Sequence, residues 1–188
     1  MITTIKAYKE SIQFSDDRIG VSCAALGSIN IDGKFLLLKE DKKFQPIGGG
    51  LKYDDSAIPF LQSIGFETDR TDNDIRIKIP KSNWNAFKLW FEKGIDRETT
   101  IDREIEEEVG PYMDPSLLRK LNTKPYFNKM VLTDKNRIFQ IHQITMDDSL
   151  KLDIIDLVTR NPNFGLFTKE EVLTRLDIIS DHSQYIII

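Results

Sequence analysis

Two pairs of apolar runs, each interrupted by a short polar turn, predict two β-hairpins. The first covers residues 18–41, where apolar segments rich in strand-forming residues flank Asp32 and Gly33. The second joins residues 125–133 to residues 137–146 around an Asp-Lys-Asn turn. Strands are therefore expected in both halves of the chain.

Apolar residues at helical spacing predict helices between and after these hairpins. Residues 96–109 are the most strongly predicted helix, because Asp96 is a capping residue, strong helix formers follow, and a Gly-Pro pair ends the run. The other predicted elements are a helix at residues 54–65, a strand at 74–80, helices at 81–93 and 149–160, and a strand at 164–167. Interspersed strands and helices favour one α/β or α+β domain over residues 1–188.

The composition supports one folded domain and excludes disorder over most of the chain. The 188 residues are 40% hydrophobic, which provides enough apolar surface for a sizeable core. A net charge of −4 argues against a protein that coats a nucleic acid polymer, while it leaves room for a small anionic ligand.

The cysteine content and the hydropathy favour a cytoplasmic protein. Cys23 is the only cysteine, so no intramolecular disulfide can form, and its apolar surroundings suggest a small buried side chain. The N-terminal sequence lacks the features of a signal peptide, and no apolar stretch is long enough to cross a bilayer. We therefore expect no membrane role for this chain.

Acidic residues concentrate in the strongly predicted helix, and three of them suggest a metal site. Glu104, Glu107 and Glu108 stand at i, i+3 and i+4, so their carboxylates share one helical face and repel one another. Such oxygen ligands suit Mg²⁺ or Mn²⁺. The alternative is a solvated acidic face on which Arg103 forms an intrahelical ion pair.

Three consecutive glycines, Gly48, Gly49 and Gly50, follow a predicted strand. Without side chains they would let the backbone approach another group closely, and the alternative is a flexible turn.

The sequence around the glutamates resembles the Nudix box. Residues 103–110, REIEEEVG, match its R-E-U-x-E-E-x-G core, in which U is a bulky aliphatic residue, and Gly49-Gly50 resemble the glycine pair that precedes it. The chain departs from the pattern by a long segment between these parts, by Ile95 where the family has its first glutamate, and by Pro111 at the final aliphatic position.

Residues 73–98, together with Asp181-His182-Ser183, resemble one subgroup, the SMODS-associated Nudix domain. Its members are encoded beside bacterial cGAS/DncV-like nucleotidyltransferases (CD-NTases) in the anti-phage signalling systems called CBASS. The resemblance implies a Nudix fold, with a mixed β-sheet sandwiched between helices. It also implies a helix-strand-helix insertion at residues 54–94, before the Nudix helix, and leaves residues 1–17 as an N-terminal extension.

The resemblance further implies a pyrophosphohydrolase that uses Mg²⁺ or Mn²⁺ to cleave a nucleoside diphosphate linked to another group. The residues it would use are Glu104, Glu107, Glu108 and the Gly50 carbonyl as metal ligands, Arg103 to orient the glutamates, Gly48 and Gly49 at the substrate, and His182 at the nucleotide or in proton transfer. The implied partners are a small nucleotide and, functionally, a CD-NTase. The sequence is also compatible with a homodimer.

Ile95 supports a second hypothesis, a weak or inactive Nudix-fold sensor that binds a cyclic oligonucleotide messenger. Glu98 either substitutes for the lost carboxylate or is a first-turn glutamate favoured by the helix dipole. The aromatic side chains of residues 84–91 are expected in the core, with base stacking as the alternative. His142, in a strand pattern, is expected to be structural.

Overall fold

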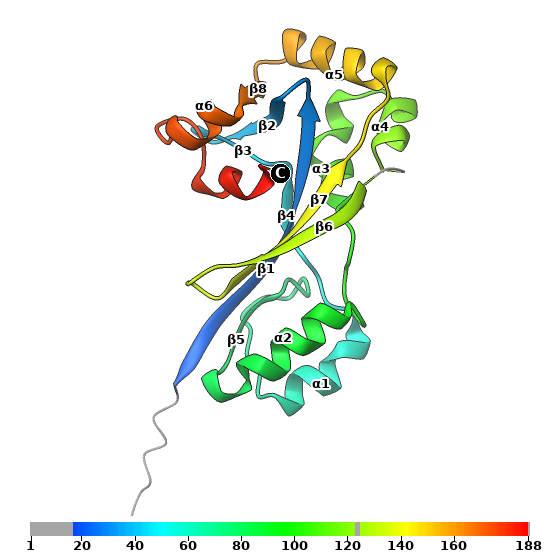
Figure 1. The fold of residues 1–188 in the computed structure, drawn as a ribbon. Helices are drawn as coiled ribbons and strands as arrows, with labels where there is room; N and C mark the ends of the chain where they lie inside the picture. The colour runs from blue at the N-terminus through cyan, green and yellow to red at the C-terminus, as the bar shows by residue number, and fades with distance from the viewer. Residues whose placement is uncertain (1–16, 123–124, 188) are drawn as a thin grey trace, which may run out of the picture.

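The computed structural model describes residues 17–122 and 125–187 (Figure 1). Its strands belong to one mixed sheet with the order β3-β2-β1-β7-β6, in which β4 and β5 also pair with β1, and β8 pairs with β2. In chain order the strands are β1 (Arg18–Ile31), β2 (Lys34–Glu40), β3 (Lys43–Gln45), β4 (Gly48–Gly50), β5 (Arg76–Pro80), β6 (Pro125–Leu132), β7 (Arg137–Ile144) and β8 (Phe164–Thr168). The predicted extension, residues 1–17, lies almost wholly outside the described residues.

Both predicted hairpins are confirmed. β1 and β2 are antiparallel, and their turn places Asp32 and Gly33 at φ 50° and 84°, the positive values that a tight two-residue hairpin turn requires. β6 and β7 are also antiparallel, while β7 runs parallel to β1. β1 is therefore the central strand, and it pairs with β2, β4, β5 and β7.

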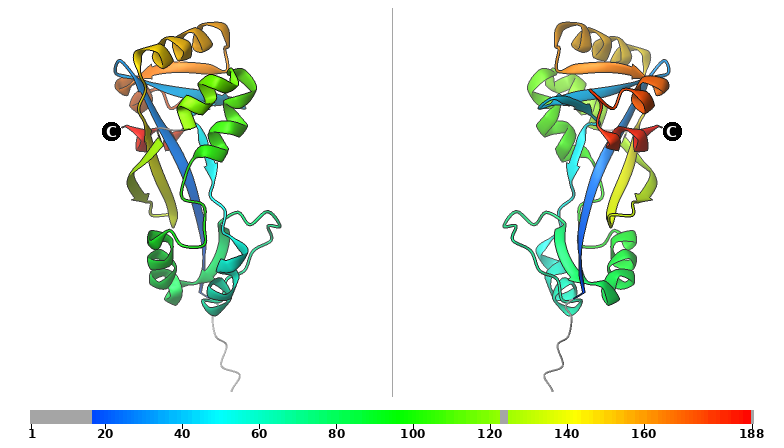
Figure 2. Two further views of the ribbon diagram at one scale, coloured as in Figure 1. Left: turned by 90° about the vertical axis from the view of Figure 1, so that its right-hand side faces the viewer. Right: turned by 90° about the vertical axis from the view of Figure 1, so that its left-hand side faces the viewer.

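Helices cover both faces of this sheet. They are η1 (Asp55–Ala57), α1 (Ile58–Ser63), η2 (Lys81–Asn83), α2 (Trp84–Lys93), α3 (Asp102–Glu108), η3 (Gly110–Tyr112), α4 (Pro115–Asn122), α5 (Asp148–Arg160), α6 (Lys169–Thr174) and η4 (Asp181–Ile186), where η marks a 3₁₀ helix. Figure 2 shows α6 and η4 on one side of β1 and α3 to α5 on the other.

The alternation of side chains along β1 explains this sandwich. Val21, Cys23 and Ala25 point into a core shared with α1 to α5, whereas Leu26 points into a second core with α6 and η4. The expected fold class, a mixed sheet between helices, is confirmed, and so is the burial of Cys23.

The segment at residues 54–94 forms α1, β5 and α2 at one end of the molecule, where β5 pairs antiparallel with the first half of β1 (Figure 1). Phe87 and Phe91 of α2 are completely buried, and Trp90 is nearly so. Phe87 and Trp90 pack with ring centroids 5.5 Å apart. This aromatic face forms part of the core and is not available to stack on a base.

The helix predicted at residues 96–109 is shorter than expected, because α3 begins only at Asp102. The chain leaves α2 through left-handed Gly94, and Asp96 is itself left-handed, with φ 58°. The backbone beyond pairs with a neighbouring extended segment: the Glu98 N–H donates to the Lys52 carbonyl at 2.8 Å. Tertiary hydrogen bonds thus replace the first helical turns, whereas the predicted end at Val109 agrees to within one residue, since α3 ends at Glu108 and Val109 is its C-cap.

Arg97 is buried and joins this segment to its surroundings. Its guanidinium donates to the carbonyls of Phe91 and Glu98 and to the side-chain oxygen of Gln140, and it lies 3.7 Å from the centre of the Phe91 ring. Burial lowers the pKa of Arg97 to about 10, so it stays charged at neutral pH. This one side chain connects α2, the approach to α3, and β7.

Candidate functional site

The strand β4 is the structural centre of the candidate site. Its three residues pair with Ala24–Leu26 of β1 along one edge. On the other edge, the Gly48 N–H donates to Glu108 Oε2 at 3.0 Å, and the Gly50 carbonyl accepts from Arg103 Nη2 at 2.7 Å. The predicted glutamate helix therefore lies beside the outer edge of the predicted glycine segment.

The absence of side chains on β4 lets two carboxylates lie against its backbone. A Cβ on Gly49 would lie 2.8 Å from Glu104 Oε1, and a Cβ on Gly50 would lie 2.8 Å from both carboxylate oxygens of Asp74. Neighbouring strand residues point to opposite faces, so Glu104 and Asp74 approach β4 from its two sides. The glycines provide close approach, and the alternative of a flexible turn is wrong.

Gly48→Ala is expected to lower the free energy of unfolding by about 2 kcal/mol, because the added Cβ would overlap the Ala25 carbonyl and Gly48 has φ 146°. Gly20→Ala is the matched control, since a Cβ there meets nothing within 4 Å; it should leave stability unchanged or raise it by less than about 1 kcal/mol. Urea unfolding followed by tryptophan fluorescence measures both. Equal stability of the two variants would contradict the close approach.

Arg103 holds the acidic side chains together. Its guanidinium lies 3.0 Å from Glu98 Oε2, 2.6 Å from Glu104 Oε1 and 3.2 Å from Glu107 Oε2. The hydrogen bonds to Glu98, followed by the charges of the other glutamates, raise the pKa of Arg103. Glu107 is 58% exposed, but the Glu104 side chain is only 9% exposed, so a simple solvated acidic face does not describe this helix.

Two of the predicted metal ligands have raised pKa values. Burial, with the neighbouring charges of Glu104, Glu40 and Glu107, raises the pKa of Glu108 to about 7, although the hydrogen bond from Gly48 opposes this shift. Burial also raises the pKa of Glu104, against the effect of Arg103. A carboxyl group with a pKa near neutrality is suited to accept a proton at physiological pH.

Glu98, and not Ile95, contacts the group of charged side chains around Arg103. Ile95 is 56% exposed, whereas Glu98 bonds Arg103 and accepts the Lys52 N–H at 3.1 Å. Because α3 begins at Asp102, the interpretation of Glu98 as a first-turn residue favoured by the helix dipole is wrong.

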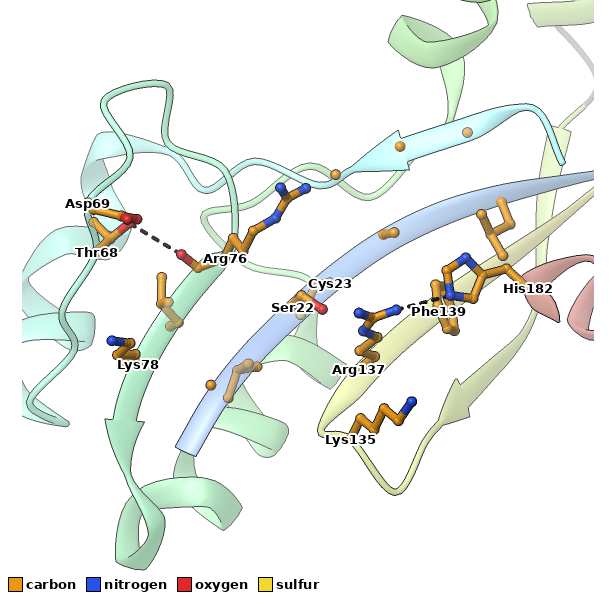
Figure 3. A pocket seen from close by; sticks show the side chains of 18 of the residues that line it. Ser22, Cys23, Thr68, Asp69, Arg76, Lys78, Lys135, Arg137, Phe139 and His182 are labelled. Carbon is orange, nitrogen blue, oxygen red and sulfur yellow. Dashed lines mark hydrogen bonds between the residues drawn. The ribbon is translucent and has the colours of Figure 1, made fainter. Parts of the chain in front are cut away.

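A cavity of about 880 Å³ lies over the face of β1 next to β4 (Figure 3). Gly20, Ser22 and Ala24 leave it open because their side chains are small or absent. The charged lining consists of four cationic side chains, Arg76, Lys78, Lys135 and Arg137, and two acidic ones, Glu67 and Asp69. The cavity is thus lined by an excess of positive charge in a protein that is acidic as a whole.

The predicted site residues fall into two groups on either side of the β4 edge. Gly48, Gly49, Gly50 and His182 line the cavity, while the side chains of the α3 group, Arg103, Glu104, Glu107 and Glu108, do not. The glycines belong to both groups because their outer backbone atoms bond α3.

The donor set beside β4 fits a divalent cation in its chemistry, since Glu104, Glu107, Glu108 and the Gly50 carbonyl provide only oxygen. Mutual repulsion and burial, which raise carboxyl pKa values here, would both be relieved by a cation. Within residues 17–122 and 125–187, however, no three Asp, Glu, His or Cys side chains are already arranged to enclose a metal. Arg103 contacts the Gly50 carbonyl instead, and metal binding would require it to leave.

Sequence analysis missed several residues that the fold brings to this region, namely Asp74, Arg76, Arg97 and Arg137. The alternating residues 76–79, Arg-Ile-Lys-Ile, carried a usable signal, because a strand with this pattern presents two cations on one face. Asp74 and Arg97 are nearly buried single charges, and no local pattern marks them.

His142 is buried in β7, in agreement with a structural role. No helix among the described residues is long and apolar enough to cross a membrane.

A family model described as the SMODS-associated NUDIX domain matches residues 18–187. Searches of curated proteins and of solved structures gave no significant match. The matched range includes β4, α3 and η4, and therefore all of the predicted site residues.

Proposed function

Since the chain belongs to the SMODS-associated NUDIX domain family, we propose that it hydrolyses a nucleoside diphosphate linked to another group, with Mg²⁺ or Mn²⁺ as cofactor. One observation supports this most directly: the carboxylates of α3 lie at the open edge of β4, beside the Gly50 carbonyl and next to a cation-lined cavity. This arrangement combines oxygen ligands for a metal with a place for an anionic substrate.

In this proposal Glu104, Glu107, Glu108 and the Gly50 carbonyl hold the metal ion. When bound, such an ion would supply positive charge against the diphosphate and would favour deprotonation of water. Arg103 releases the Gly50 carbonyl and keeps its ion pair with Glu98, which maintains the position of α3. Glu108, held at the β4 edge by the Gly48 N–H, would accept a proton from the attacking water through a carboxylate oxygen.

Chromatography of a nucleotide panel after incubation with protein and Mg²⁺ or Mn²⁺ tests this proposal. The panel contains nucleoside triphosphates, dinucleoside polyphosphates, NAD, ADP-ribose and cyclic di- and trinucleotides. Products that require the metal and are lost with Glu108→Gln would identify the substrate class. An unchanged panel would contradict the hydrolase.

A second candidate is a Nudix-fold sensor that binds a cyclic oligonucleotide without cleaving it. The contact of Arg103 with the Gly50 carbonyl and Glu104 favours it, because this cation already neutralises the place where a metal would bind. Calorimetric titration of cyclic di- and trinucleotides in EDTA tests the sensor. Binding without turnover would support it, and no binding of any such nucleotide would contradict it.

Both candidates place the protein in bacterial anti-phage nucleotide signalling, where a CD-NTase would make the nucleotide. We propose the cytoplasm as its location and a homodimer as its oligomeric state. Co-expression with a CD-NTase tests the link: phage resistance that requires both proteins would support it, and resistance without either one would contradict it. Resistance that survives Glu108→Gln would argue against hydrolysis as the output.

A further inference from the structure

Two arginines flank the same residue of β1 on the floor of the cavity. Ser22 is opposite Arg76 on β5 and opposite Arg137 on β7. Residues directly opposite in neighbouring strands point to the same face, so both arginines extend over the cavity from its two sides (Figure 3). Two strand spacings of about 4.8 Å place their Cα atoms about 10 Å apart.

Each arginine is held by its own partner, so the two do not converge on one point. Arg76 Nη2 lies 3.3 Å from Asp74 Oδ2, and the Asp74 side chain is only 8% exposed. Arg137 Nη1 lies 3.0 Å from His182 Nε2, and the His182 ring packs on Phe139 with centroids 5.2 Å apart. Burial lowers the pKa of His182, which favours a neutral ring that accepts the arginine N–H.

Both arginines keep donors for a ligand. Arg76 is 59% exposed and Arg137 is also exposed, while a guanidinium carries five N–H donors. Lys78 and Lys135 add one cation on each side, on β5 and on the β6–β7 turn. The two positive regions are separated by Ser22 and by the open floor of Gly20 and Ala24.

We propose that this cavity binds a nucleotide bearing phosphate groups at two separate positions, one held by Arg76 and the other by Arg137. A cavity of about 880 Å³ is much larger than a phosphate or a pyrophosphate requires, and it matches a nucleotide-sized ligand. Gly48, Gly49 and Gly50 line this cavity and their outer backbone atoms bond α3, so a ligand bound there would lie beside the proposed hydrolytic site. Such a nucleotide would be the substrate class of the proposed hydrolase. Its cleavage depends on that proposed function, whereas its binding does not.

Calorimetric titration in EDTA tests binding separately from hydrolysis. The probes are the 3′,5′-bisphosphates of adenosine, guanosine, cytidine and uridine, with the corresponding 5′-monophosphates for comparison. At least one bisphosphate should bind about tenfold more tightly than its monophosphate, because the second phosphate gains a charge-assisted hydrogen bond. Arg76→Gln and Arg137→Gln should each reduce this advantage to about twofold or less.

Arg119→Gln, an exposed arginine of α4 that does not line the cavity, is the matched control and should retain the advantage. Circular dichroism verifies that all three variants are folded. The proposal is overturned if no bisphosphate exceeds its monophosphate, or if the advantage persists in both cavity variants. Turnover in the nucleotide panel without a bisphosphate advantage would contradict this inference alone, while the advantage without turnover would contradict the hydrolase alone.

Discussion

Glu108→Gln is expected to reduce turnover of the substrate found in the nucleotide panel by about 100-fold or more. Glutamine keeps the size of the side chain and can still lie beside the Gly48 N–H, but it cannot accept a proton from water and is a weaker metal ligand. The position of Glu108 beside the Gly48 N–H, on the helix that carries the other proposed metal ligands, is the reason to expect it to take part in the reaction. Steady-state kinetics at saturating Mg²⁺ would separate lost turnover from weaker substrate binding.

The matched control is Glu106→Gln, which makes the same chemical change on the same helix. Glu106 is exposed, and the ion pairs of Arg103 within the described residues are with Glu98, Glu104 and Glu107 instead. Its turnover should equal that of the original sequence. If Glu108→Gln retained full activity, the α3 carboxylates would not be the catalytic group, whatever reaction the panel revealed.

Arg97→Ala is expected to lower the free energy of unfolding by about 4 kcal/mol. The substitution leaves the acceptors on Phe91, Glu98 and Gln140 without their buried donor and opens a cavity beneath the Phe91 ring. The gain from no longer burying a charge offsets only part of this loss, since a truncated side chain does not fill the space. Urea unfolding followed by tryptophan fluorescence measures the change.

Arg119→Ala provides the comparison, because Arg119 is exposed on α4 and its truncation should change stability by no more than about 0.5 kcal/mol. Arg97→Lys should fall between the two, since an ammonium keeps the charge but cannot reproduce the planar set of donors. A stability of Arg97→Ala close to that of Arg119→Ala would show that the insertion does not depend on this side chain for its attachment.

The sequence was sufficient to predict those features that depend on interactions between residues close together in the chain. The turn at Asp32 and Gly33 requires positive φ at two successive residues, so the first hairpin was predictable from residue type. Glu104, Glu107 and Glu108 do lie on one helix, as their spacing indicates, while their role as metal ligands stays a prediction. The family resemblance then supplied a fold that these local predictions were compatible with but did not select.

Tertiary contacts decided what those patterns left open. The helix α3 begins at Asp102 and not at Asp96, because the backbone between these residues forms hydrogen bonds with a segment distant in the chain. Helix propensities describe local preferences and do not include such tertiary hydrogen bonds. The same displacement brought Glu98 to Arg103 and left Ile95 in solvent.

The cationic lining of the cavity also depends on tertiary structure, namely on the register in which β5 and β7 pair with β1. Arg76 and Arg137 are 61 positions apart in the chain, and only the pairing of both strands with Ser22 places them on one face. The sequence by itself therefore determined the local elements and the identity of the carboxylate group. The tertiary structure decided which backbone edge that group faces and which cations lie beside it, because strand pairing joins residues whose separation along the chain carries no local signal.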